Sequence, residues 1–165
     1  MKPVLGIEAK SEIAERLTAT LLAVLLIVAM VLWTAPAFAW AVGKCPLTQG
    51  FWKNHPDDWP VSSLTLGTVA YTEAQLITIL KTPVGGDASL DLAHQLIAAM
   101  LNVANGSDPG PISATITDAN GDLGTGTIPE GIAPSSPLGA DMVNDAAGLD
   151  AYNEGELTPI CMSAY

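Results

Sequence analysis

Positive charge is scarce in this 165-residue sequence and absent from its second half. The chain has six Lys and Arg residues against 17 Asp and Glu, which gives a net charge of −11 at pH 7. No Lys or Arg follows Lys81, whereas eleven acidic residues do. Such a chain repels phosphate backbones and anionic lipid headgroups, so we expect no nucleic-acid partner. Solubility is one explanation of the acidity, and affinity for cations or for a basic partner is another.

The familiar catalytic motifs are also missing. The sequence has no G-x-S-x-G elbow, no P-loop and no G-x-G-x-x-G after a strand pattern. It has only two histidines and two cysteines, so a zinc centre with three protein ligands would have to recruit a carboxylate. We therefore expect no cofactor, with a divalent cation as the one alternative.

A long uncharged run stands near the start of the chain. Residues 17–43 carry no charge, basic residues precede them, and alanines occupy positions 37 and 39. This order is typical of a secretory signal, so we expect cleavage after Ala39 and a single secreted or cell-surface domain at 40–165. The run is also long enough for an uncleaved anchor, in which case only this segment would touch a membrane. Acylation of Cys45 and a specialised export signal are two further alternatives.

The two cysteines, Cys45 and Cys161, stand near the two ends of the predicted exported domain. An even number of cysteines in an exported protein favours a disulfide. Two separate buried thiols are the alternative. We expect the bond, because no other feature of the sequence would hold the C-terminal tail.

Local signals predict helices. Thr72 and Gln75 form a capping box, Asp87 can cap a longer helix, and Pro137 can open the last one. No segment shows sustained alternation of apolar and polar residues with β-branched enrichment, so strands are marginal at most. We predict an all-α domain in which an irregular, Trp-rich segment at residues 45–68 packs across about four short helices, at residues 72–82, 87–104, 112–123 and 137–153.

Residues 118–122 admit a second interpretation. Asp118, Asn120 and Asp122 place oxygens at positions 1, 3 and 5 of a loop like the opening of an EF-hand calcium site. Position 6 of that pattern is Leu123 instead of glycine, and position 12 is Pro129. An amphipathic helix fits the apolar spacing better, and calcium binding is the alternative.

The densest cluster of functional side chains begins at residue 48. Residues 48–56 read T-Q-G-F-W-K-N-H-P, and L-T-L-G, T-P-V-G-G and L-A-H-Q-L-I follow at 64–67, 82–86 and 92–97. These segments resemble a module of exported bacterial proteins built around a T-Q-G-(F/Y)-W-K-N-H-P core. The resemblance covers roughly residues 45–106. It implies export and a shared fold, and it supplies no activity and no catalytic residue.

This cluster can be interpreted in three ways. It can be a hydrogen-bonded plug over the helices, because buried indole N–H groups need acceptors. It can be a binding surface for a sugar or a partner protein, using Phe51, Trp52, Lys53, Asn54, His55 and Trp59. It can also belong to a metal-dependent hydrolase, in which the ligands would be His55, Asp57, Asp58, Asp91 and His94.

The sequence therefore favours an exported, non-catalytic helical domain. Its function would be binding or assembly outside the cytosol, with an unknown protein or glycan as the partner. The metal-dependent hydrolase is the alternative from another class. The two hypotheses differ in one geometric respect, since the hydrolase needs the two histidines at one solvent-reachable point.

Overall fold

A computed structural model describes residues 43–158 and residue 161. The predicted signal at residues 1–39, its cleavage site and the start of the domain at residue 40 lie outside the described residues. The described chain contains the helices α2 (Gln49–Asn54), α3 (Glu73–Lys81), α4 (Ala88–Ala104), α5 (Ser113–Leu123) and α6 (Pro137–Asn153), the short 3₁₀ helices η1 (Pro56–Asp58) and η2 (Gly110–Ile112), and the strands β1 (Ser63–Leu66) and β2 (Val69–Thr72).

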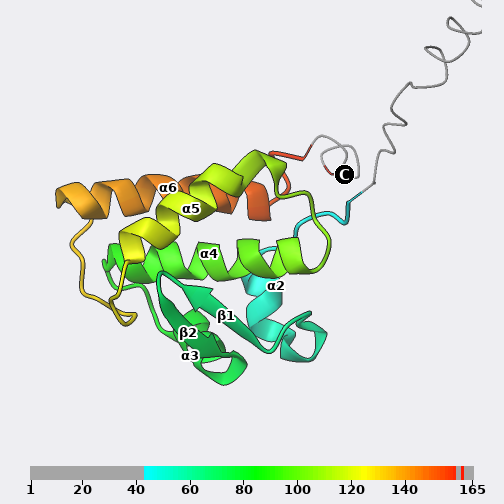
Figure 1. Cartoon of the computed structure of the whole chain (residues 1–165), viewed down its shortest axis with the longest axis horizontal. Helices are drawn as coiled ribbons and strands as arrows, with labels where there is room; N and C mark the ends of the chain where they lie inside the picture. Colours follow the sequence, from blue (N-terminus) through cyan, green and yellow to red (C-terminus); the bar gives the residue numbers. More distant parts are fainter. Residues whose placement is uncertain (1–42, 159–160, 162–165) are drawn as a thin grey trace, which may run out of the picture. The chain divides into compact units, whose positions relative to one another are not determined.

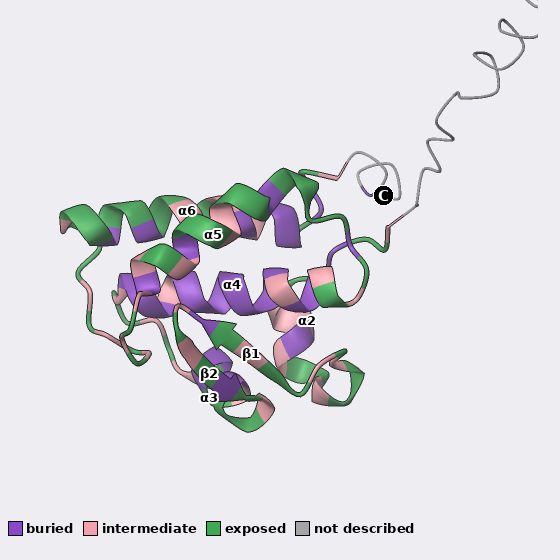
Figure 2. Ribbon diagram, viewed as in Figure 1, coloured by how far each residue is buried: buried purple, intermediate pink, exposed green. Residues whose placement is uncertain are grey.

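Helix α4 is the centre of the domain. It packs against α2, α3, α5, α6 and β1, and Figure 1 shows it between the α5–α6 pair and the layer of α3 and the hairpin. Every residue from Ala88 to Ala99 except Asp91 is buried, which is why α4 appears almost wholly purple in Figure 2. Helix α4 is therefore covered on several sides and not along one apolar stripe alone.

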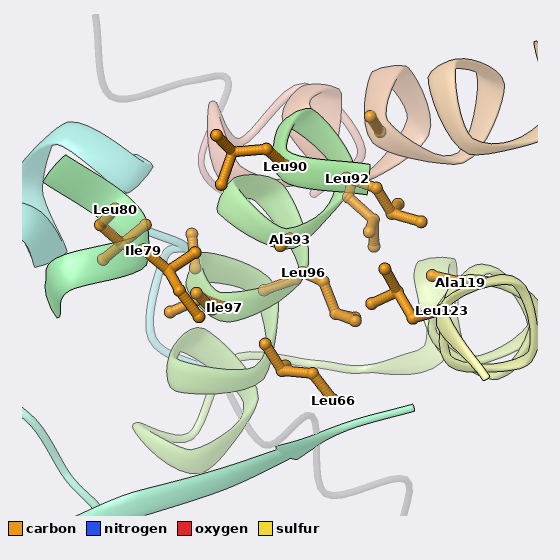
Figure 3. Close-up of a cluster of buried hydrophobic side chains, with 14 of the residues drawn as sticks. Leu66, Ile79, Leu80, Leu90, Leu92, Ala93, Leu96, Ile97, Ala119 and Leu123 are labelled. Atoms are coloured by element: carbon orange, nitrogen blue, oxygen red, sulfur yellow. The ribbon is translucent and has the colours of Figure 1, made fainter. Parts of the chain in front are cut away.

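The core joins both layers through α4. In Figure 3, Ile97 of α4 lies beside Ile79 of α3, whereas Leu92 and Leu96 of α4 extend toward Ala119 and Leu123 of α5. Leu92, Leu96 and Leu123 are each at most 2 % exposed. Burying an apolar side chain of this size contributes about 1.5–3 kcal/mol, so these leucines hold the two layers to one helix.

The predicted helices are confirmed, and so are the capping residues named for two of them. Gln75 Oε1 accepts a hydrogen bond of 2.9 Å from the Thr72 backbone N–H at the start of α3. Asp87 Oδ1 accepts one of 3.0 Å from the Ser89 N–H at the start of α4. Helix α4 ends where Gly106 takes a positive φ of 101°, a conformation that glycine adopts without strain.

The prediction of an all-α fold needs a correction, because the domain is mostly α with a small antiparallel hairpin. Strands β1 and β2 pair from Ser63 opposite Thr72 to Leu66 opposite Val69. Each strand has only four residues, too few to show the alternation that identifies a strand in a sequence.

The hairpin turn is held by a distant part of the chain. Gly67 has a φ of 60°, and a Cβ at this position would overlap the carbonyl oxygen of Gly124. The N–H of Thr68 donates to that same oxygen at 2.8 Å, and the N–H of Gly67 donates to Asn120 Oδ1 at 2.8 Å. Tertiary contacts at the end of α5 therefore fix a turn that the local sequence does not specify.

The prediction of an irregular segment at residues 45–68 is also wrong. Besides β1, this segment contains α2 and η1. Thr48 caps α2 by accepting a hydrogen bond of 3.2 Å from the Phe51 N–H through its hydroxyl. Pro56 then begins η1, as expected for a residue whose fixed φ suits a helix start.

The predicted disulfide is present between Cys45 and Cys161, 116 positions apart in the sequence. The first described residues and the last ones lie at the same end of the domain (Figure 1). Close to the bond, the Lys44 N–H donates to the carbonyl of Gly106 at 3.1 Å. Among residues 43–158 and 161, no helix has the length and apolar character needed to cross a bilayer.

Candidate functional site

Trp52 is the centre of the Trp-rich segment, and it lies inside the domain. The side chain is 1 % exposed. Its indole N–H donates a hydrogen bond of 3.0 Å to the side-chain oxygen of Asn102 on α4. The predicted role of Trp52 in a binding surface is therefore not supported by its position, because no partner can reach the ring.

Asn102 joins three separate parts of the chain. In addition to the hydrogen bond from the indole of Trp52, Asn102 Oδ1 accepts one of 2.8 Å from the Leu47 N–H. Its Nδ2 donates to the carbonyl of Leu47 at 2.8 Å and to Asn153 Oδ1 on α6 at 2.9 Å. The amide of Asn153 in turn donates to the backbone carbonyl and to the side-chain oxygen of Gln95, both at 3.0 Å. This buried network has no formal charge and satisfies each polar group it uses.

The sequence analysis did not identify Asn102 or Asn153 as important. The sequence signal that could have found them is a polar residue on the buried face of each of two long helices, Asn102 on α4 and Asn153 on α6. Asn102 and Asn153 are at most 1 % exposed, and a buried carboxamide must find partners. The sequence does not say which residues those partners are, since they lie 50 or more positions away.

Trp59 also directs its polar atom into the domain. Its indole N–H donates to the backbone carbonyl of Trp52 at 2.9 Å, and the residue is half-buried. Both indole N–H groups of this segment are therefore used within the fold. The structural interpretation of the two tryptophans accounts for them without any ligand.

What remains at the surface of α2 and its C-cap is a small aromatic and polar ledge, formed by Phe51, Asn54 and His55. The ring of His55 stacks on the ring of Phe51 with 4.3 Å between centroids and 14° between planes. His55 Nδ1 also shares a hydrogen bond of 2.9 Å with the carbonyl of Phe51. Asn54 and His55 are exposed, and Phe51 and Lys53 are half-buried.

The five residues proposed as metal ligands do not come together. His94 is 5 % exposed, and its Nε2 shares a hydrogen bond of 2.7 Å with the carbonyl of Ile79 on α3. Asp91 instead lines a groove with Gln95 and Asp150, toward α6. Among the described residues, no group of three or more His, Cys, Asp or Glu side chains is placed to hold a metal ion. The geometry that the hydrolase hypothesis needs is therefore not found with His55, Asp57, Asp58, Asp91 and His94.

The loop suggested for calcium is part of helix α5. Asn120 Oδ1 accepts from the Gly67 N–H, and Asn120 Nδ2 donates to the carbonyl of Ile116 at 2.7 Å. Both ends of this carboxamide are occupied by protein groups. The predicted amphipathic helix is confirmed, and the loop geometry of an EF-hand is not formed by Asp118, Asn120 and Asp122.

Two of those residues do contribute to an acidic groove between α5 and α6. Asp118 and Asp122 of α5 line it with Asp141 and Asp145 of α6, and its volume is about 560 Å³. Burial, followed by repulsion from the neighbouring carboxylates, raises the pKa of Asp122 and of Asp145. The sequence could not reveal this groove, because it depends on how the two helices align.

Burial lowers the pKa of His94, and its bond to the Ile79 carbonyl and the charge of Asp91 oppose this only in part. Because the pKa of His94 is lower in the folded state, its contribution to the free energy of unfolding is fully present above pH 6.5, the ordinary pKa of histidine. This contribution is lost as the pH falls from 6.5 toward the lowered pKa. We expect His94→Gln to abolish this loss, because glutamine can still donate to Ile79 and does not titrate.

Urea denaturation from about pH 5 to pH 8 measures the effect. His55→Gln is the matched control, since it removes a histidine from the surface of α2 and should keep the wild-type dependence on pH. A His94→Gln variant with the same acid-induced loss as the wild type would show that His94 is not its source.

Comparison of the chain with protein-family models, with characterised proteins and with solved structures finds no match.

Proposed function

We propose that this chain acts outside the cytosol as a non-catalytic helical domain that binds or assembles with a protein or glycan partner. The observation that carries the proposal is how the candidate side chains are used. The indole groups of Trp52 and Trp59 and the imidazole of His94 are all bonded to other parts of the domain. In contrast to these buried or half-buried groups, Asn54 and His55 of the ledge are exposed.

In this proposal the motif at residues 48–56 is mainly a folding unit. Thr48 caps α2, Trp52 anchors it to α4, and Asn54 closes it by donating to the carbonyl of Gly50 at 2.8 Å. These contacts give the side chains of Thr48, Trp52 and Asn54 a structural role. The proposal extends to the module of exported proteins that the motif resembles, in which the same residues would fasten the amino-terminal segment to a helical core.

Export is the second part of the proposal, and the disulfide supports it. Disulfides persist in oxidising compartments and are rare in the cytosol. The signal predicted from residues 1–39 would take the chain to such a compartment, either released after Ala39 or held by an uncleaved anchor. The strongly negative net charge favours a neutral or cationic partner and disfavours an anionic one.

The ledge on α2 is the part of the motif that is best placed for contact. Phe51 and His55 present a stacked aromatic pair, and Asn54 beside them is exposed. Aromatic side chains, phenylalanine among them, are enriched at the cores of protein interfaces. A glycan or a protein could pack against the ring of His55 without disturbing Trp52.

In-cell photo-crosslinking tests the proposal. A photo-reactive amino acid at position 55 should give a discrete adduct with an extracytoplasmic component in the cells that produce the chain. The same group at Thr125, which is exposed in another part of the domain, is the matched control and should not. Equal labelling at both positions, or none at position 55, would contradict the binding surface. Recovery of the full-length chain from the cytosol with both thiols reduced would contradict export.

A further inference from the structure

Residues 124–136, here called the 124–136 loop, connect α5 to α6 and reach back to the start of α4 (at the left in Figure 1). Asp87, just before α4, binds this loop through its carboxylate. Oδ2 accepts from the Gly131 N–H at 2.9 Å, and Oδ1 accepts from the Ile132 N–H at 3.1 Å. Oδ1 also accepts from the N–H and the hydroxyl of Ser89.

Two further bonds fasten the same stretch. The hydroxyl oxygen of Ser89 accepts from the Glu130 N–H at 2.9 Å, and the Ala88 N–H donates to the carbonyl of Ile132 at 2.8 Å. Three successive backbone N–H groups of the loop are therefore held by Asp87 and Ser89. These hydrogen bonds act beside the apolar packing of Ile128 and Ile132 against the core, and they respond to local charge.

The side chain of Glu130 is the one part of this attachment without a partner. Its Oε1 is buried and makes no hydrogen bond. The carboxyl group packs against Gly126, where even a single Cβ atom would overlap it. An ionised carboxylate oxygen held in this way, close to the negative charge of Asp87, costs free energy, whereas a neutral carboxyl costs less.

We propose that Glu130 makes the 124–136 loop a pH-dependent closure, in which a neutral Glu130 lets the loop sit against α4 and an ionised Glu130 loosens it. The two carboxyl groups respond to acid in opposite ways. Burial, followed by the charge of Asp87, raises the pKa of Glu130. Burial would also raise the pKa of Asp87, but the hydrogen bonds from Ser89, Gly131 and Ile132 outweigh it and lower the pKa.

The direction in which loop closure depends on pH follows from these two pKa shifts. The closed loop binds the Glu130 proton more tightly than an open loop does, so closure strengthens as the pH falls from the raised pKa toward 4.5, the ordinary value. Other charged groups stand on the elements packed against the loop, namely Glu73 and Lys81 on α3 and Asp91 and His94 on α4. Among these four groups and Asp87, only the charge of Asp87 shifts the pKa of Glu130.

Closure of the loop also shapes a neighbouring groove. Thr127 and Ile128 form one wall of a mainly apolar groove of about 500 Å³, and Tyr71 and residues of α3 form the other wall. The Ile128 N–H donates to the Tyr71 hydroxyl at 3.2 Å across it. Loosening the loop at neutral pH would therefore change the groove as well as the attachment at α4.

Amide hydrogen exchange at residues 130–132 tests this inference, after correction for the intrinsic dependence of exchange on pH. In the wild-type chain we expect protection to rise as the pH is lowered from about 7 to about 4.5, by up to about tenfold for each unit by which the pKa of Glu130 is raised. Glu130→Gln mimics the neutral acid and should stay protected across this range.

Asp145→Asn is the matched control, because it removes another carboxyl group with a raised pKa from the α5–α6 groove. It should keep the wild-type profile at residues 130–132. Protection that does not depend on pH in the wild type would overturn the inference, and so would a Glu130→Gln variant with the wild-type profile. The wild-type profile is decisive by itself if that variant does not fold.

Discussion

Replacing Asn102 with alanine is expected to lower the free energy of unfolding by about 3–5 kcal/mol, the range in which broken buried hydrogen-bond networks fall. The substitution leaves the indole N–H of Trp52 and both backbone groups of Leu47 without partners at once. Each unsatisfied buried polar group costs about 1–3 kcal/mol, and the missing side chain adds a small cavity. Urea denaturation, followed by tryptophan fluorescence, measures the loss.

Two matched variants separate hydrogen bonding from volume at this position. Asn102→Asp keeps the shape but replaces the donor nitrogen, which faces the carbonyl of Leu47 and Asn153 Oδ1, with a second acceptor. It should be destabilised at neutral pH like the alanine variant. Asn54→Ala removes one exposed hydrogen bond on α2 and should change stability by no more than about 0.5 kcal/mol. Equal effects of Asn102→Ala and Asn54→Ala would show that the buried network contributes little.

Reduction of the Cys45–Cys161 disulfide is expected to lower the free energy of unfolding by roughly 3–5 kcal/mol on the chain-entropy model. The bond joins residues 116 positions apart, so it constrains nearly the whole unfolded domain. Cys45 is exposed while Cys161 is buried, so a reductant can approach the bond from the side of Cys45. Urea midpoints with and without reductant give the size of the effect.

The double variant Cys45→Ala/Cys161→Ala is the control for this experiment. It should have the stability of the reduced wild-type chain and should not respond to reductant. A wild-type midpoint that is unchanged on reduction would mean that the hydrogen bonds around Lys44 and the C-terminal turn hold the two ends without the bond. In that case the disulfide would indicate an oxidising compartment and would not contribute to stability.

Much of the helical structure could be predicted because its signals are local. Thr72 with Gln75 and Asp87 act within one helical turn of the helices they cap. The hairpin could not be predicted in the same way. Its turn depends on Gly124 and Asn120, more than 50 positions later, and its four-residue strands are too short to show a period.

The candidate site was predicted less well than the fold. Residues 48–59 were singled out for their density of functional side chains, but Thr48, Trp52 and Trp59 of this segment serve folding. His94 and Trp52 were candidates because of their type, and their partners, the Ile79 carbonyl and Asn102, decide that they are structural. The acidic groove was missed because it combines carboxylates from two helices.

The amino-acid sequence alone determined the net negative charge, the capped helices and the two cysteines, Cys45 and Cys161, that could pair. These properties depend on composition or on neighbours within a turn. Only the folded chain decided which tryptophan was buried, which histidine was buried against a carbonyl and which acids became neighbours. Such outcomes arise because a polar atom removed from water must bond to whatever group packing brings within reach, and that group can come from any point along the polypeptide.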